Sequence, residues 1–378
     1  MELSLYIHIP FCVSKCDYCD FFSEEFNHLP DYLQVVRRGH GDFFDVFLDD
    51  VIKDIYEQVD FFNVDSFPTV YIGGGTPSVL GKDIKILFNA LKSLPAFAPI
   101  EFTVEANPES LTEEFLVCCK EGGVTRLSLG VQTFYEPSRS SVNRKGDSAM
   151  LEKALSLANK YFPGNLSADL ITGFPFHTKE IVKEDIKRLL EHNPAHVSVY
   201  SLTVEKETPL YKKLKTGALS LPDKDTSDEL WLTARDILVN SGFQHYEVSN
   251  FAKEGKQCLH NIRYWRMQGW LGAGPSASGT IVDFDNGTAL RTILACTAIA
   301  HKEQIAITKE QLLKEVILMG YRYCEGPDPK WGVEKLIPKT LEKWKGKDIM
   351  LFLNSFLIDA FGELDGQAGL PFSASSSA

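Results

Sequence analysis

Three cysteines, Cys12, Cys16 and Cys19, stand within eight residues of one another near the start of the chain. A closed structural metal site takes four protein ligands, whereas three thiolates on a cubane iron–sulfur cluster leave one iron free to bind another group. The number of these cysteines therefore indicates a cluster with one open iron, where chemistry could occur. Half of a zinc site, or a chance group of thiols, is the alternative.

A glycine-rich run, 73–77, follows a short apolar segment and contains Gly74, Gly75 and Thr76. Glycine lets a backbone approach a ligand closely, and successive glycines offer unblocked N–H groups. The run is a candidate ligand-binding loop, although a plain tight turn would use the same residues.

Four further polar residues come near the ends of apolar segments: Glu105, Gln132, Arg144 and Asp169. Singly, such residues are more often structural polar groups. Together their chemistry is complementary, because Arg144 can pair with a carboxylate and Asp169 can bridge ribose hydroxyls. Glu105 and Gln132 can hold other polar groups, so the set predicts one shared polar site.

The elements that must position these residues follow an alternating pattern. Short apolar, β-branched segments typical of buried strands lie at 3–9, 69–72, 100–104, 126–129, 166–171 and 196–202. Between them, amphipathic segments with helical spacing include 78–93, 111–120, 148–161 and 179–191. Repeated strand–helix units require parallel strands with helical crossovers, in a doubly wound sheet or a barrel. Because polar groups follow nearly every strand, we expect an α/β fold with a complete or partial parallel βα barrel.

The pattern changes near the end of the chain, which predicts a second, smaller domain. We expect a barrel domain at 1–280, a C-terminal accessory domain of mixed or helical structure at 281–370, and a disordered tail at 371–378. A length of 378 residues exceeds the size at which one hydrophobic core stops growing, which also favours one large and one smaller domain.

The composition narrows the function classes. A net charge of -12 argues against a large nucleic-acid interface, because phosphate contacts need clustered Lys and Arg. No apolar run reaches the ~18 residues of a membrane span and no signal peptide is evident, so a cytoplasmic location is expected. Reduced cysteines are expected in that compartment. Five scattered cysteines are predicted to be small buried side chains: Cys118, Cys119, Cys258, Cys296 and Cys324.

The cysteine segment resembles the cluster loop of the radical S-adenosylmethionine superfamily, in its CxxxCxxC spacing, its place after the first strand and the aromatic Tyr18 before the last cysteine. The resemblance implies a [4Fe–4S] cluster on the three cysteines, with the cofactor's methionyl amine and carboxylate on the fourth iron. By the same matching the glycine run binds the methionyl amino group. The residues that the resemblance places around the cofactor are Tyr6, Tyr18, Gly74, Gly75, Thr76, Glu105, Gln132, Arg144 and Asp169.

From Leu5 to about Gly274 the chain resembles the branch of that superfamily that handles porphyrins. This branch contains the oxygen-independent coproporphyrinogen III oxidases and the heme chaperones called HemW. The oxidases carry a further cysteine where this chain has Phe21, and a long segment before the cluster loop, for which there is no room here if the chain is complete. Both features favour the chaperones.

The run 260–265, which includes His260, Tyr264 and Trp265, is similar to the HNxxYW motif associated with heme binding in the chaperones. An imidazole can ligate heme iron, and the aromatic rings could contact the macrocycle. The alternative is that His260 ties a loop to the barrel while the aromatic residues are core. Ser278 stands near a place where the family often has a histidine.

Two other histidines are expected to be structural: His8 as a buried, hydrogen-bonded residue and His177 as a loop residue. The resemblance implies a heme chaperone that delivers heme or a porphyrin to an acceptor protein, for instance a membrane-bound one, with an electron donor and no nucleic-acid partner. The rival is oxidative decarboxylation of coproporphyrinogen III. A radical enzyme acting on RNA is disfavoured by the acidic charge, and a zinc-binding module is the structural alternative.

Overall fold

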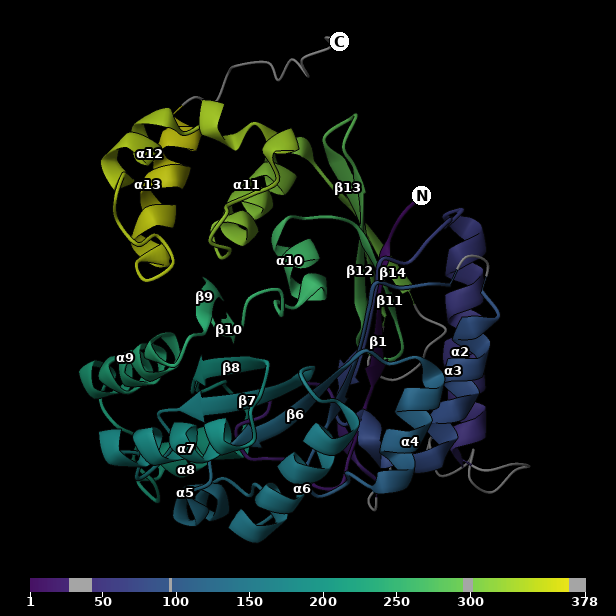
Figure 1. Cartoon of the computed structure of the whole chain (residues 1–378). Coiled ribbons are helices and arrows are strands. Elements are labelled where there is room, and N and C mark those ends of the chain that lie inside the picture. Colours follow the sequence, from purple (N-terminus) through teal and green to yellow (C-terminus); the bar gives the residue numbers. More distant parts are fainter. Residues whose placement is uncertain (27–42, 95–96, 295–301, 367–378) are drawn as a thin grey trace.

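The computed structural model describes residues 1–26, 43–94, 97–294 and 302–366 (Figure 1). Within them, twelve strands form one sheet in the order β14-β13-β12-β11-β1-β4-β5-β6-β7-β8-β10-β9. Neighbours from β11 to β8 are parallel. The parallel strands are β11 (Trp270–Ala273), β1 (Ser4–Ile9), β4 (Thr69–Gly74), β5 (Glu101–Ala106), β6 (Arg126–Gln132), β7 (Leu166–Thr172) and β8 (His196–Ser201).

Antiparallel strands extend both edges of this parallel sheet. One edge carries β12 (Ser278–Asp283), β13 (Thr288–Leu294) and β14 (Lys302–Ile307), and the other carries β10 (Asn250–Ala252) and β9 (Gln244–Glu247). The strand order is linear within the described residues, so the sheet curves without closing. The predicted α/β fold is confirmed, and of the two barrel forms considered the partial one is present.

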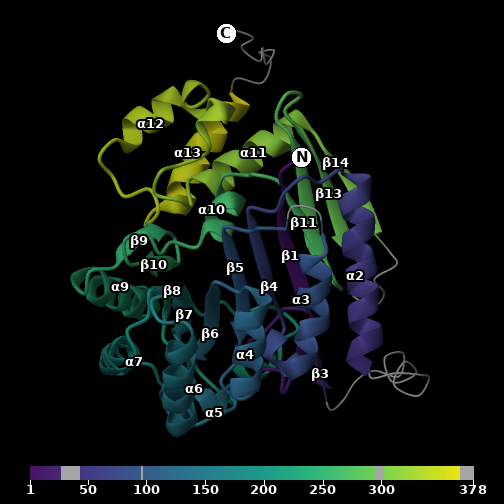
Figure 2. The same ribbon diagram turned by 45° about the vertical axis from the view of Figure 1, so that its right-hand side comes forward.

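Helices cover the outer face of the curved sheet (Figures 1 and 2). They are α2 (Phe43–Phe61), α3 (Ile84–Lys92), α4 (Glu113–Gly122), α5 (Glu136–Ser141), α6 (Ser148–Tyr161), α7 (Lys179–Glu191), α8 (Pro209–Lys215) and α9 (Lys224–Asn240), with a 3-10 segment η2 (Pro77–Asp83). The pleat of β1 shows why this arrangement is stable: Leu5, Ile7 and Ile9 join the main hydrophobic core, whereas Tyr6 and His8 alternate onto the inner face. Side chains on the inner face are therefore available for a site.

The sheet does not stop at the predicted domain boundary, because residue 280 lies inside β12 and pairing continues to β14. The predicted boundary lies where the strand–helix alternation of the sequence changes, and that change does not reveal which strands pair across it. Three helices supply most of a second hydrophobic core: α11 (Lys309–Gly320), α12 (Pro338–Trp344) and α13 (Leu353–Asp365). We therefore propose Thr308, the N-cap of α11, as the boundary of the helical part. The predicted tail at 371–378 lies outside the described residues.

None of the described helices is both long and apolar enough to cross a membrane. Cys118, Cys119 and Cys258 are buried as expected, and Cys296 lies outside the described residues. Cys324 is exposed, contrary to the prediction, because it occupies the turn after α11, where its backbone N–H donates to the carbonyl of Tyr246 at 2.9 Å.

Candidate functional site

A cavity of about 420 Å³ opens where the parallel strands end. Most of the residues singled out in the sequence line it: Cys12, Cys16, Tyr18, Cys19, Gly74, Gly75, Thr76, Glu105, Gln132, Arg144 and Asp169. This convergence follows from the topology, because the carboxyl ends of parallel strands share one edge of the sheet. Tyr6 and His260 do not line it.

The cluster loop follows β1 and is held in place by short local contacts. Cys12 closes the short strand β2 (Phe11–Cys12), which pairs with β3 (Glu24–Glu25). The backbone N–H of Lys15 donates to the carboxylate of Glu25 at 2.9 Å, and that of Cys19 donates to the carbonyl of Cys16 at 3.1 Å. These bonds fold the loop so that all three cysteines face the same cavity.

The described residues contain no group of three His, Cys, Asp or Glu side chains close enough to hold a single metal ion. A four-iron cube is larger than one ion, so its thiolates bind separate corners and need not meet at one point. The donor set, three thiols around one cavity, therefore fits a cubane cluster and not a closed zinc site.

Burial raises the pKa of Cys12, and it raises that of Cys19 to about 11. Without metal these thiols are protonated at neutral pH, because the surrounding protein disfavours the thiolate. Iron would have to displace the protons, so assembly of a cluster should release acid.

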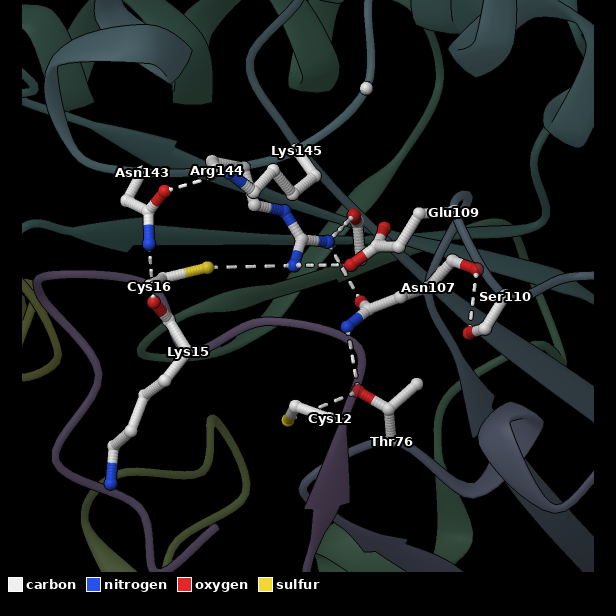
Figure 3. Close-up of polar contacts among 12 residues, drawn as sticks. Cys12, Lys15, Cys16, Thr76, Asn107, Glu109, Ser110, Asn143, Arg144 and Lys145 are labelled. Carbon is white, nitrogen blue, oxygen red and sulfur yellow. Dashed lines mark hydrogen bonds and ion pairs between the residues drawn. The ribbon is translucent and has the colours of Figure 1, made fainter. Parts of the chain in front are cut away.

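A chain of polar contacts joins Cys12 to Cys16 across the cavity wall (Figure 3). The hydroxyl of Thr76 lies 3.4 Å from Cys12 Sγ and accepts from Asn107 Nδ2 at 2.7 Å. Asn107 Oδ1 in turn accepts from Arg144 Nη2 at 2.7 Å, and Arg144 Nη1 lies 3.7 Å from Cys16 Sγ. Sequence reasoning missed Asn107, whose only signal is its place directly after β5.

Arg144 is buried, and both of its Nη groups are engaged within the protein. Besides Asn107 it donates to the carbonyl of Gly130 at 2.6 Å and pairs with Glu109 at 3.6 Å. The sequence interpretation held that Arg144 can pair with a carboxylate, and in the structure that carboxylate is Glu109. A cofactor role for Arg144 stays a prediction, and it would use Nε, which has no partner in the described part of the chain.

The glycine run is required by close packing against the strand that carries the cluster loop. Gly74 has φ +109°, and a Cβ there would lie 2.6 Å from the ring of His8. A Cβ on Gly75 would lie 2.8 Å from the carbonyl of Phe11. The sequence predicted free N–H groups in this run, but they are engaged in hydrogen bonds. The N–H of Gly75 donates to the carbonyl of Ile9 at 2.8 Å. An amine ligand donates hydrogen bonds, so it does not need these N–H groups.

Two carboxyl groups, Glu105 and Asp169, face the cavity from its floor. Glu105 accepts from the Tyr71 hydroxyl at 2.6 Å, and Asp169 accepts from the Ser128 hydroxyl at 3.2 Å. Burial raises the pKa of Glu105 to about 7 and that of Asp169 to about 6. Beside them Gln132 has φ +71° at a register shift in β6, and its Oε1 has no partner within the described residues. Perturbed carboxyls, backbone strain and an unpaired amide oxygen together mark a ligand site.

The raised pKa of Glu105 predicts a pH-dependent stability. Its folded pKa of about 7 exceeds the ordinary value of 4.5, so the folded state holds the proton more tightly and loses stability as pH rises through that window. We expect Glu105→Gln to remove up to about 3 kcal/mol of this loss. Urea unfolding at pH 5 and pH 8 would measure it, with the exposed Glu254→Gln as control. Parallel pH profiles for Glu105→Gln and wild type would contradict the expectation.

Tyr6 and His8 lie behind the cavity and support the cluster loop. His8 Nε2–H donates to the carbonyl of Phe22 at 2.8 Å, and its Nδ1 accepts from the Tyr6 hydroxyl at 3.0 Å. His8 is thus buried and hydrogen-bonded, as expected. Tyr6 contacts His8 and Tyr71 instead of the cavity, so its predicted contact with a cofactor stays a prediction.

His260 lies at the opposite end of the barrel, on α10 (Leu259–Trp265) beside the first residues of β4 and β5 (Figure 1). Its side chain is 1% exposed and is packed between the rings of Tyr71 and Tyr264, at centroid distances of 5.2 and 4.6 Å. In this conformation Tyr264 belongs to the packed interior, as the structural alternative expected. Among the described residues, His260 is not part of the lining of the cavity at the strand ends.

The hydrogen bonds of His260 determine its tautomer. The Thr69 hydroxyl donates to Ser4, so it must accept from His260 Nδ1–H, at 2.9 Å. Nε2 then carries a lone pair, and it has no partner among the described residues. Burial, with the nearby charge of Arg263, lowers the pKa of His260 to about 3. The ring is therefore neutral at physiological pH, with its free nitrogen in the form that ligates metals.

A buried ion pair anchors α10. The carboxylate of Glu101 accepts from the backbone N–H groups of Leu259 and His260, at 3.2 and 3.0 Å, and pairs with Arg126 at 3.1 Å. Arg126 donates to the two carbonyls before the helix, those of residues 256 and 257. Sequence reasoning missed this pair, because each residue merely begins a strand.

Three remaining positions were singled out in the sequence. Phe21 lines the cavity and is 64% exposed. His177 is buried in its loop, and both ring nitrogens lack partners in the described part of the chain. Ser278 is exposed at the start of β12.

Residues 6–189 match the model of the radical SAM superfamily. The chain is 32% identical to the heme chaperone HemW of Lactococcus lactis subsp. lactis, over 94% of this chain and 90% of that protein. It is 35% identical to the heme chaperone HemW of Escherichia coli K12, over 77% and 73%. Among solved structures it resembles coproporphyrinogen III oxidase (HemN) from Escherichia coli, with a TM-score of 0.74, 20% identity and coverage of 95% and 90%. At that identity the structural likeness shows the fold alone.

Proposed function

This chain belongs to the HemW family of heme chaperones within the radical S-adenosylmethionine superfamily, and from that premise we propose that it binds heme and transfers it to an acceptor protein. The proposal includes a [4Fe–4S] cluster and S-adenosylmethionine at the carboxyl ends of the strands. The observation that carries the cofactor part is the convergence on one cavity of three cysteines and four polar residues, which come from β5, β6, β7 and the loop after α5.

Different residues would hold the cluster and the S-adenosylmethionine. Cys12, Cys16 and Cys19 would ligate three irons, while the backbone of the glycine run would face the methionyl amine. Asp169, ionised above its raised pKa of about 6, can accept from hydroxyl groups, and Glu105 can accept from an amine. When bound, the cluster supplies an electron at low potential and the sulfonium supplies an adenosyl group for radical chemistry.

For heme, we propose that His260 is the ligand and that α10 must open to present it. What supports this is the lone pair on Nε2, which is buried without a partner among the described residues and so costs free energy while the helix is closed. Ligation of heme iron would satisfy that nitrogen. The helix is short, seven residues, so local opening need not disturb the sheet.

The rival, oxidation of coproporphyrinogen, is less well supported, because the cavity presents Phe21 where the oxidases carry a further cysteine. The proposal further includes an acceptor protein, for instance a membrane-bound one, and an electron donor for the cluster. A cytoplasmic location is part of it, favoured by the free thiol state of the described cysteines.

Heme titration of the anaerobically reconstituted protein tests the proposal. We expect a saturable Soret band in the wild type that is lost in His260→Ala. His196→Ala is the matched control, because His196 is equally buried but has both nitrogens bonded, to Ser167 and Tyr246. Equal binding by wild type and His260→Ala would remove the ligand assignment. Turnover of coproporphyrinogen would replace the chaperone by the oxidase.

A further inference from the structure

A second buried guanidinium, Arg139 on α5, lies behind the cavity wall and is not among the residues that line the cavity. It is 1% exposed, and its partners are all backbone carbonyls. Nη1 donates to Val131 and Thr133 at 2.7 and 2.9 Å, Nε donates to Gly146 at 2.8 Å, and Nη2 donates to Lys145. Arg139 therefore ties the end of β6 to the loop that carries Arg144.

The backbone of Arg139 holds the same loop. Its carbonyl accepts from the N–H of Arg144 at 2.9 Å and from that of Val142 at 3.3 Å. Arg144 then reaches Cys16 Sγ through its Nη1. One residue thus fixes, by side chain and main chain together, the position of the guanidinium that faces a cluster cysteine.

Three charged side chains are buried in this region: Arg139, Arg144 and Asp185. Arg139 forms no ion pair within the described residues. Two carboxylates lie near it: Glu109 is paired with Arg144, and Asp185 accepts from the Thr133 hydroxyl and the N–H of Phe134. Asp17 on the cluster loop is likewise paired, with Lys213 at 2.5 Å. Burial and the charge of Arg144 lower the pKa of Arg139 to about 10, so it stays protonated at neutral pH. Arg139 and Arg144 therefore bring two positive charges close to Cys16, and neither Glu109 nor Asp185 forms an ion pair with the Arg139 guanidinium.

Burying a cation among neutral carbonyls is costly, and an apolar side chain would fill the same space without that cost. A cluster bound to thiolates is anionic and becomes more negative on reduction, and its potential depends on nearby charge. A fixed positive charge in a low-dielectric wall therefore favours the reduced form.

We propose that Arg139 raises the reduction potential of the cluster by placing a buried positive charge, bonded only to backbone carbonyls among the described residues, behind Cys16. The inference deepens the proposed function, because it requires the cluster to be present. It assigns Arg139 as a residue that acts through charge and through the position of Arg144, without itself touching a ligand.

An EPR-monitored redox titration of the reconstituted protein, without S-adenosylmethionine, tests the proposal. Arg139→Gln removes the charge but leaves an amide that can donate to the carbonyls, and Arg139→Lys keeps the charge. We expect Arg139→Gln to lower the equilibrium constant for reduction about tenfold, which is about 59 mV for one electron. Arg139→Lys should stay close to wild type. Arg291→Met, which removes a charge on β13 at the far edge of the sheet, should not change it.

Each outcome supports or overturns the inference. An unchanged reduction potential in Arg139→Gln with full iron content overturns it. An equal fall in the potential of Arg139→Lys and Arg139→Gln also overturns it, because the effect would then come from packing and not from charge. If Arg139→Gln does not fold, Arg139→Met is the second neutral variant. A wild-type protein that assembles no [4Fe–4S] cluster overturns both the proposed cofactor site and this inference. An assembled cluster whose potential is unchanged in Arg139→Gln overturns this inference alone, so the two failures are distinguishable.

Discussion

Replacing Cys16 by alanine is expected to abolish the iron–sulfur cluster while the chain stays folded. Cys16 lies beside Arg144 and is one of the three thiols that line the cavity. With two thiolates left, a cubane loses a corner ligand and a second iron becomes open to water. Iron and sulfide per chain should fall to background after anaerobic reconstitution, and the charge-transfer absorbance should vanish.

Cys324→Ala is the control for that experiment, because Cys324 is an exposed thiol far along the chain. It should retain the full cluster, and the circular dichroism of both variants should match that of wild type. A Cys16→Ala protein that still carries four irons would show that another group supplies the third ligand, and the cluster assignment would have to be revised.

Breaking the anchor of α10 is expected to have the largest effect on stability. Glu101→Gln leaves Arg126 as a buried cation without its carboxylate, and removal of one member of a buried pair costs about 3–5 kcal/mol. Urea unfolding would measure the loss. The matched control is Glu315→Gln, whose pair with Arg291 is partly exposed and should be worth about 1 kcal/mol or less.

The Glu101→Gln variant also tests whether Glu101 keeps α10 closed or only stabilises the fold. If Glu101 holds α10 closed, Glu101→Gln should bind heme faster than wild type although it is less stable. The added change His260→Ala should cancel the gain. Slower binding in Glu101→Gln would instead indicate that the anchored helix is the form that receives heme.

Sequence reasoning succeeded where local pattern determines geometry. Alternating strands and helices imply a common carboxyl edge, so the sequence alone was enough to assign Cys12, Glu105 and Asp169 to one site. It could not find Asn107, because its role comes from Thr76 and Arg144, which lie far from it in the chain.

Two other residues show different limits. The family resemblance places Tyr6 beside the cofactor, and that contact stays a prediction. The depth of the cavity, and not strand position alone, decides which inner-face residues line it, and Tyr6 is not among them. His260 comes from a distant segment, and no pattern in the sequence tells which end of the barrel that segment covers.

The predicted domain boundary at residue 280 lies inside β12. Pairing between strands from distant parts of the chain produces no local pattern in the sequence.

The rings of His8, Tyr6, Tyr71, His260 and Tyr264 form a continuous row through the inside of the barrel, with centroid distances between 4.6 and 6.3 Å. Close-packed interiors resist gradual deformation, so one ring cannot shift far without displacing its neighbour. His8 supports the cluster loop at one end of the row, and α10 closes the other end. The row therefore joins the support of the cluster loop to the helix at the opposite end of the barrel through direct ring contacts alone.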